Sequence, residues 1–209
     1  MKNNFIFLTI FSLLFFVGCG QSNRTNVQSK DCIEKKYALQ LLIDSCLTHQ
    51  PNAMNNDVSR SMLADTIRTT IQQFIGDTLP FLADIPLQYE MCLEYPNDSY
   101  SKNAGKYVVK FGFGEHTSKC KLSDDYKTTF QIFTIMEKAQ VAQLVDNALY
   151  RVNGVFVDFA NNSQKTGFIL PSGKCLIDYP TIMTIENKPY IDLGTLIIEN
   201  TTCKKIGQN

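Results

Sequence analysis

The feature that most constrains the fold is a change in the spacing of apolar residues along the chain. Between residues 86 and 136, three segments alternate apolar and polar residues with a period of two. This period places successive side chains on opposite faces of a strand, so each segment predicts a half-buried β-strand. Residues 137–150 then show helical spacing, and a fourth alternating segment follows at 151–161. The pattern predicts three strands, a helix and then further strands.

The apolar face of each predicted element can be read from the same spacing. In the first two strands these faces consist of Tyr89, Met91, Leu93 and Tyr95, and of Tyr107, Val109, Phe111 and Phe113. The predicted helix has its stripe at Val141, Leu144, Val145, Ala148 and Leu149. Residues 166–179 suggest a small hairpin, and two more strands are expected in 181–200, joined at Glu186–Pro189.

Two helices are predicted ahead of the strands. Apolar residues recur at helical spacing in residues 31–48 and again in 58–75. Asp31 and Asp57 stand where an N-terminal cap is expected, since a short acidic side chain accepts hydrogen bonds from free backbone N–H groups. Pro51 separates the two segments, and Gly76 with Pro80 ends the second.

The N-terminal segment has the layout of a secretory signal. Lys2 precedes an apolar run from Phe5 to Val17, and Gly18 then precedes Cys19. A charged start, an apolar core and a small-residue exit are the parts of such a signal. The run is shorter than the roughly 20 residues that a membrane-spanning helix needs. We therefore expect residues 1–18 to be a signal peptide and the mature chain to be exported.

The end of this segment, Phe16-Val17-Gly18-Cys19, resembles the lipobox of bacterial lipoproteins, although that family usually has leucine at the place of Phe16. The resemblance implies that Cys19 is lipidated and attaches the mature chain to a bilayer. The alternative is an ordinary secretory signal. Residues 20–30 are polar, so residues 19–30 are expected to be the lipid anchor and a flexible tether. No acidic cluster follows Cys19, which favours the periplasmic side of the cell envelope over the cell surface.

The order of the predicted elements resembles the OB-fold, a small, partly open Greek-key barrel. Such modules occur in exported bacterial lipoproteins and are similar in shape to anticodon-binding-like domains. The residues that carry the resemblance are VVKFGFGEH, TTFQIFTIM, the helix through Leu149 and YRVNGVFVDF. It implies an α+β chain in which a two-helix segment, 31–79, precedes a barrel, 80–209. The barrel would have five or more antiparallel strands, with the helix between strands 3 and 4. A β-sandwich of the immunoglobulin type with an inserted helix is the alternative.

Six cysteines remain besides Cys19, an even number that permits up to three disulfides in an oxidising compartment. They are Cys32, Cys46, Cys92, Cys120, Cys175 and Cys203. Their spacing matches no zinc motif, and the pairing stays open. Cys92 shares a predicted strand face with Gln88, Glu90 and Glu94. A thiol on a polar face is paired or reactive, and we favour pairing.

The search for functional residues gives two candidate sites and no catalytic or metal-binding motif. Four aromatic residues are candidates for a binding face, with core packing as the alternative: Tyr89, Tyr95, Phe111 and Phe113. The second candidate is a thiol site, because His116 lies four residues before Cys120 and an imidazole can lower the pKa of a thiol. No cofactor is predicted.

The charge balance bears on the choice of partners. Lysine plus arginine and aspartate plus glutamate number 20 each in the 209 residues, and removal of residues 1–18 removes only Lys2. A near-neutral chain argues against nucleic-acid binding, which depends on neutralising phosphates. Besides the bilayer, the expected partner is an envelope protein or a glycan. The sequence favours a membrane-anchored binding or scaffold module, with a thiol-dependent enzyme or redox protein of the cell envelope as the alternative.

Overall fold

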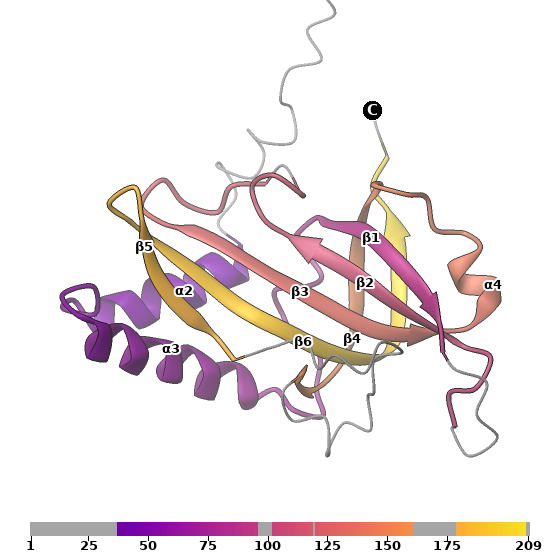
Figure 1. Cartoon of the computed structure of the whole chain (residues 1–209), viewed down its shortest axis with the longest axis horizontal. Coiled ribbons are helices and arrows are strands. Elements are labelled where there is room, and N and C mark those ends of the chain that lie inside the picture. The colour runs from indigo at the N-terminus through magenta and orange to yellow at the C-terminus, as the bar shows by residue number, and fades with distance from the viewer. Residues whose placement is uncertain (1–36, 96–101, 119, 161–178, 208–209) are drawn as a thin grey trace, which may run out of the picture.

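Six strands form one sheet, and two helices precede them in the chain (Figure 1). The computed structural model describes residues 37–95, 102–118, 120–160 and 179–207. The helices are α2 (Ala38–His49), α3 (Asp57–Gln72) and α4 (Lys138–Val141). The strands are β1 (Leu87–Glu94), β2 (Tyr107–Phe113), β3 (Lys127–Met136), β4 (Leu149–Phe159), β5 (Thr181–Ile185) and β6 (Lys188–Lys205). The predicted α+β class and the order of two helices before the strands are confirmed.

The first and last strands of the sheet are not all free edges, because additional pairing closes five of the strands into a ring. Strand β1 lies between β2 and β4, and β6 lies between β4 and β5, with all of these pairs antiparallel. Strand β3 pairs with β2 on one side and, in parallel, with β6 on the other. Strands β1, β2, β3, β6 and β4 are thus hydrogen-bonded in a ring, with β5 outside it. The parallel pair departs from the expected antiparallel order, because the chain crosses over through β4 and β5 before β6 reaches β3.

Strand β6 is long enough to pair with both of its neighbours in the ring. It pairs with β3 from Tyr190 to Ile198 and with β4 from Leu196 to Lys205. At the change of partner, Asn200 has a φ of 52° and the register with β4 shifts. The buried hydroxyls of Thr134 on β3 and Thr201 on β6 are hydrogen-bonded at 2.5 Å. This bend and this contact hold the two parts of β6 in their separate pairings.

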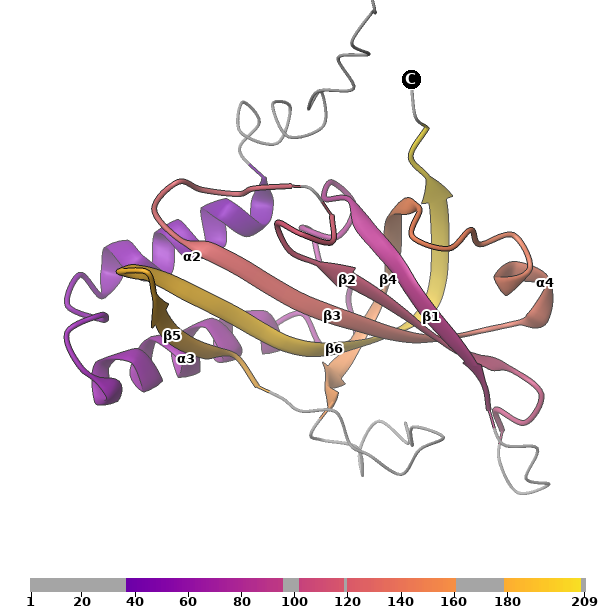
Figure 2. The same cartoon turned by 45° about the horizontal axis from the view of Figure 1, so that its top comes forward.

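The helices share one hydrophobic core with the sheet. Fully buried side chains from α2 and α3, such as Ile43 and Ile67, belong to the same cluster as Phe111, Phe130 and Phe156 of the strands. Figures 1 and 2 show α2 and α3 together at one end of the sheet near β5, and α4 at the other end. A second, smaller buried cluster consists of Tyr95, Val108, Phe133, Ala160 and Ile197.

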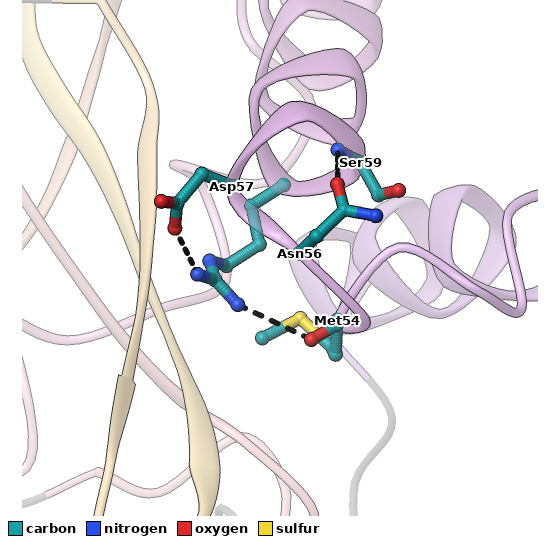
Figure 3. A network of polar contacts seen from close by, with 5 residues as sticks. Met54, Asn56, Asp57 and Ser59 are labelled. Atoms are coloured by element: carbon teal, nitrogen blue, oxygen red, sulfur yellow. Dashed lines mark hydrogen bonds and ion pairs between the residues drawn. The ribbon is translucent and has the colours of Figure 1, made fainter.

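The start of α3 lies one residue before the predicted one. Asn56 is the N-cap, and its side-chain oxygen accepts a hydrogen bond of 2.9 Å from the Ser59 N–H (Figure 3). Asp57, the predicted cap, is the first helical residue and forms an ion pair with Arg60. Arg60 also donates to the Met54 carbonyl at 3.2 Å. Asp31, the other predicted cap, lies outside the described residues.

Helix α4 lies between β3 and β4, but the predicted helix through Leu149 is wrong. The helix ends at Val141, and Leu149 is the first residue of β4. The Val145 N–H donates to the Tyr150 hydroxyl at 2.8 Å, and Asn147 has a φ of 57°. These two features turn the chain into β4 after one helical turn. The amphipathic spacing therefore continues past the end of the helix.

The β5–β6 hairpin is confirmed at its predicted place. Its two loop residues, Glu186 and Asn187, both have positive φ, at 52° and 61°, as a tight two-residue turn requires. The hairpin predicted in residues 166–179 lies outside the described residues apart from Tyr179.

Candidate binding surface

The four aromatic residues predicted as a binding face are buried. Tyr89, Phe111 and Phe113 belong to the main core, and Tyr95 lies in the smaller cluster. The Phe111 ring lies 6.0 Å from that of Tyr89, and the Phe113 ring stacks on Phe130 at 5.1 Å. The prediction of a binding face is wrong for these residues. Tyr89, Phe111 and Phe113 point to the inner side of the ring of strands, whereas Tyr95 is covered by the residues of the smaller cluster.

The predicted thiol site is not formed. Cys120 is disulfide-bonded and only 1% exposed, so its sulfur is not a free thiol. Among the other described cysteines, Cys46, Cys92 and Cys203 are free. His116 is exposed in the turn that follows β2. The site fails because the sulfur that the imidazole would activate is already bonded.

The three described free cysteines lie against the core. Burial raises the pKa of the Cys46 thiol, and it raises the pKa of the Cys203 thiol to about 12. Cys92 is half-buried, packs on the main core and is hydrogen-bonded to Tyr89. Both expectations for Cys92, a disulfide and a polar strand face, are therefore wrong.

A bulge in β1 explains why Cys92 faces inward. Tyr89 pairs with Phe111 and Met91 with Lys110, so Glu90 is an extra residue in the ladder. One extra residue reverses the alternation of faces beyond it. Met91 and Leu93, predicted to share the apolar face of Tyr89, are instead 39% and 41% exposed.

The bulged residue forms an ion pair on the outer face of the sheet. The Glu90 Oε2 atom lies 2.7 Å from Lys110 Nζ, and both side chains are largely shielded from solvent. Gly112 makes room for this carboxylate, because a Cβ atom there would lie 1.8 Å from Glu90 Oε1. Partial burial of a pair strengthens its attraction but also costs solvation of both charges.

Beyond the bulge, β1 has a strand partner on one side only among the described residues. It pairs with β4 through Leu87 and Gln88 alone, and the Gln88 amide donates to Asn147 Oδ1 at 3.1 Å. Backbone groups on the far edge of a strand without a partner are available to another chain. We call Glu90, Met91, Leu93 and Lys110, next to this edge, the β1 surface.

The β1 surface combines two exposed apolar side chains with one cation and one anion. This set suits recognition of a polymer segment rather than proton transfer or nucleophilic attack. Among the described residues, no three side chains of the metal-binding types gather in one place. The residues that could have pointed to this surface in the sequence are Glu90, Lys110 and Gly112, an acid, a base and a glycine on neighbouring strands. Their proximity depends on the bulge in β1, which the alternation of apolar and polar residues does not indicate.

Comparisons with models of known protein families, with curated proteins and with solved structures gave no match to this chain. In the described part of the chain, no helix is both long enough and apolar enough to cross a membrane.

Proposed function

We propose that this chain is an exported, membrane-anchored binding or scaffold module that holds a segment of a partner protein on the β1 surface. The support for export and anchoring is the signal-like segment at the start of the chain, which is followed directly by Cys19. Cys19 lies outside the described residues. The absence of an acidic cluster after it supports the periplasmic side of the cell envelope.

We further propose that the ring of strands is a small barrel of the OB type. Five strands paired in the order β1-β2-β3-β6-β4, and a helix between β3 and β4, support this assignment. Strand β5 is then an addition to the barrel. A shared fold does not carry function with it, so the choice of ligand rests on the surface residues.

The observation that carries the proposed function is the exposure of Met91 and Leu93 beside the Glu90–Lys110 pair and the far edge of β1. An extended segment of another protein can add to such an edge through backbone hydrogen bonds, while its side chains contact the apolar and charged groups. A glycan is polar and would use few of the contacts that the apolar side chains of Met91 and Leu93 offer. The near-neutral charge of the chain disfavours nucleic acid as the partner.

Site-specific photocrosslinking in the native cells tests this proposal. A photoreactive amino acid placed at Leu93 is expected to give one discrete protein adduct, whose site on the partner is then mapped. The same amino acid at Leu41 of α2, which is also exposed, is the matched control and is expected to give none. Lys110→Glu is expected to reduce the Leu93 adduct, because it replaces the attraction to Glu90 with repulsion and alters the charge of the surface.

Equal adducts from Leu93 and Leu41 would overturn the proposal, and so would the absence of any adduct at Leu93. An adduct with a glycan instead of a protein would reject the proposed class of partner. Far-ultraviolet circular dichroism of each variant shows that the fold is retained, so a missing adduct is not due to unfolding.

A further inference from the structure

Strand β5 lies at the edge of the sheet and is not part of the ring of strands. Among the described residues it pairs with β6 alone. Its sequence, Thr181-Ile-Met-Thr-Ile185, contains no charged residue, and four of its five residues are exposed. Ile182 is the exception and belongs to the main core. Proteins usually protect an edge strand with charge, proline or a bulge inside the strand, and β5 has none of these.

Large apolar side chains are exposed on β5. Met183 and Ile185 are 49% and 40% exposed on the face of β5 opposite Ile182. Helix α3 packs against β5, and Arg68 of this helix lies over the ring of Tyr179, just before the strand. Both views show α3 running beside this strand (Figures 1 and 2). The outer face of β5 is therefore more apolar than a solvated edge requires.

The hairpin geometry determines which backbone groups of β5 face outward. A two-residue turn is closed by a pair that exchanges backbone hydrogen bonds, here Ile185 and Lys188, and such pairs alternate along the ladder. Thr181 and Met183, like Ile185, direct their backbone groups to β6. Ile182 and Thr184 thus direct theirs to the outer edge, with two N–H donors and two carbonyl acceptors between them.

We propose that a second copy of this chain pairs with β5, antiparallel and edge to edge, on a two-fold axis at Met183. This register sets Met183 opposite its own counterpart and Ile182 opposite Thr184 of the second copy. All outward donors and acceptors of Ile182 and Thr184 then form hydrogen bonds across the axis. A shift in either direction would involve Pro180, which has no N–H, or the charged turn residue Glu186.

The composition of β5 favours a second copy over a different protein. A two-fold axis at Met183 places this residue against its own counterpart, so a charged residue there would face a like charge. The uncharged side chain of Met183 avoids this repulsion. The pairing would also bring Met183 and Ile185 of both copies onto one face and remove them from water.

Sedimentation velocity of the full-length protein in detergent tests this proposal, with the detergent contribution subtracted. The wild-type chain is expected to form a concentration-dependent dimer. Met183→Lys and Met183→Glu each place like charges opposite one another, and each is expected to weaken dimerisation on the order of 100-fold. An equimolar mixture of the two variants is expected to recover the dimer, because Lys and Glu then face each other. Leu41→Lys, an equivalent change on exposed α2, is the control and should leave the dimer intact.

A wild-type chain that stays monomeric at all concentrations would overturn the inference, as would a dimer that survives both charge variants. Two charge variants that remain monomeric when mixed would reject the register at Met183, and with it this proposal. Recovery in the mixture also shows that each variant is folded. The result is independent of crosslinking at Leu93, so either proposal can fail without the other.

Discussion

At the scale of single residues, two glycines of the sheet allow close approach of different kinds of neighbour. A Cβ atom on Gly112 would meet the carboxylate of Glu90, at the end of a flexible side chain. A Cβ atom on Gly154 would lie 2.8 Å from the backbone carbonyl oxygen of Glu199 on β6. A side chain can rotate away, whereas a paired strand cannot move without loss of its hydrogen bonds.

We therefore expect Gly154→Ala to lower the free energy of unfolding by roughly 1–3 kcal/mol, the cost of overpacking a well-packed site. Gly112→Ala is expected to cost less than about 1 kcal/mol, because the flexible Glu90 side chain can rotate away and only its pairing with Lys110 is lost. Urea denaturation of both variants measures the difference. Glu90→Ala is the control background, in which the cost of Gly112→Ala should disappear. Equal costs at the two glycines would contradict this explanation.

At the scale of elements, the first turn of α3 depends on a side chain just outside the helix. Asn56 has extended backbone angles, with φ at −157°, and its Oδ1 atom accepts from the Ser59 N–H (Figure 3). This hydrogen bond satisfies one of the backbone donors that a helix leaves free at its start. Because α3 carries Leu63, Ile67 and Ile71 into the core, its start also affects the packing of the sheet.

Asn56→Ala is expected to lower the free energy of unfolding by about 1 kcal/mol, because the Ser59 N–H loses its acceptor. Asn56→Asp retains an oxygen at the same place and is the matched control, with an expected change of only a few tenths of a kcal/mol. Thermal and urea denaturation measure both variants. If Asn56→Asp destabilised the protein as much as Asn56→Ala, the side-chain hydrogen bond would not be the cause.

At the scale of the whole molecule, weakly acidic groups are buried in several separate parts of the core. Burial raises the pKa of Cys46 in α2, of Tyr89 in β1, of Tyr126 before β3 and of Cys203 in β6. Tyr126 also donates a hydrogen bond of 2.9 Å to Asp44 Oδ1, which ties α2 to the start of β3. Each group is neutral when protonated, so the folded state favours the protonated form.

These groups predict a loss of stability at alkaline pH. The ordinary pKa is 9.0 for a cysteine and 10.0 for a tyrosine. Below these values both states are protonated, and the full stability is present. As pH rises, the unfolded chain loses its protons first. The free energy of unfolding therefore falls from about pH 9 upward, and it continues to fall until the folded pKa of about 12 for Cys203 is passed. Denaturation between pH 7 and pH 11 measures the slope, which should be smaller in Cys203→Ala. A flat profile would contradict the burial of these groups in solution.

Local patterns gave good predictions for regular segments and poor ones where distant contacts decide. The helical spacing of residues 58–75 matches α3 closely, and the turn at Glu186 lies where it was expected. The stripe through Leu149 failed, because Tyr150 and Asn147 divert the chain after Val141. The aromatic candidates for a binding face failed because spacing identifies the two faces of a strand but not which one is covered.

The sequence by itself determined the α+β class, the order of the elements and most strand positions, because these depend on residues that are neighbours in the chain. Only the tertiary structure decided the parallel pairing of β3 with β6, the bulge at Glu90 and the disulfide state of Cys120. Each depends on contacts between residues far apart in the chain, to which local spacing is insensitive. A single extra residue at Glu90 reverses the faces of β1, so it turns Met91 and Leu93 outward and Cys92 inward.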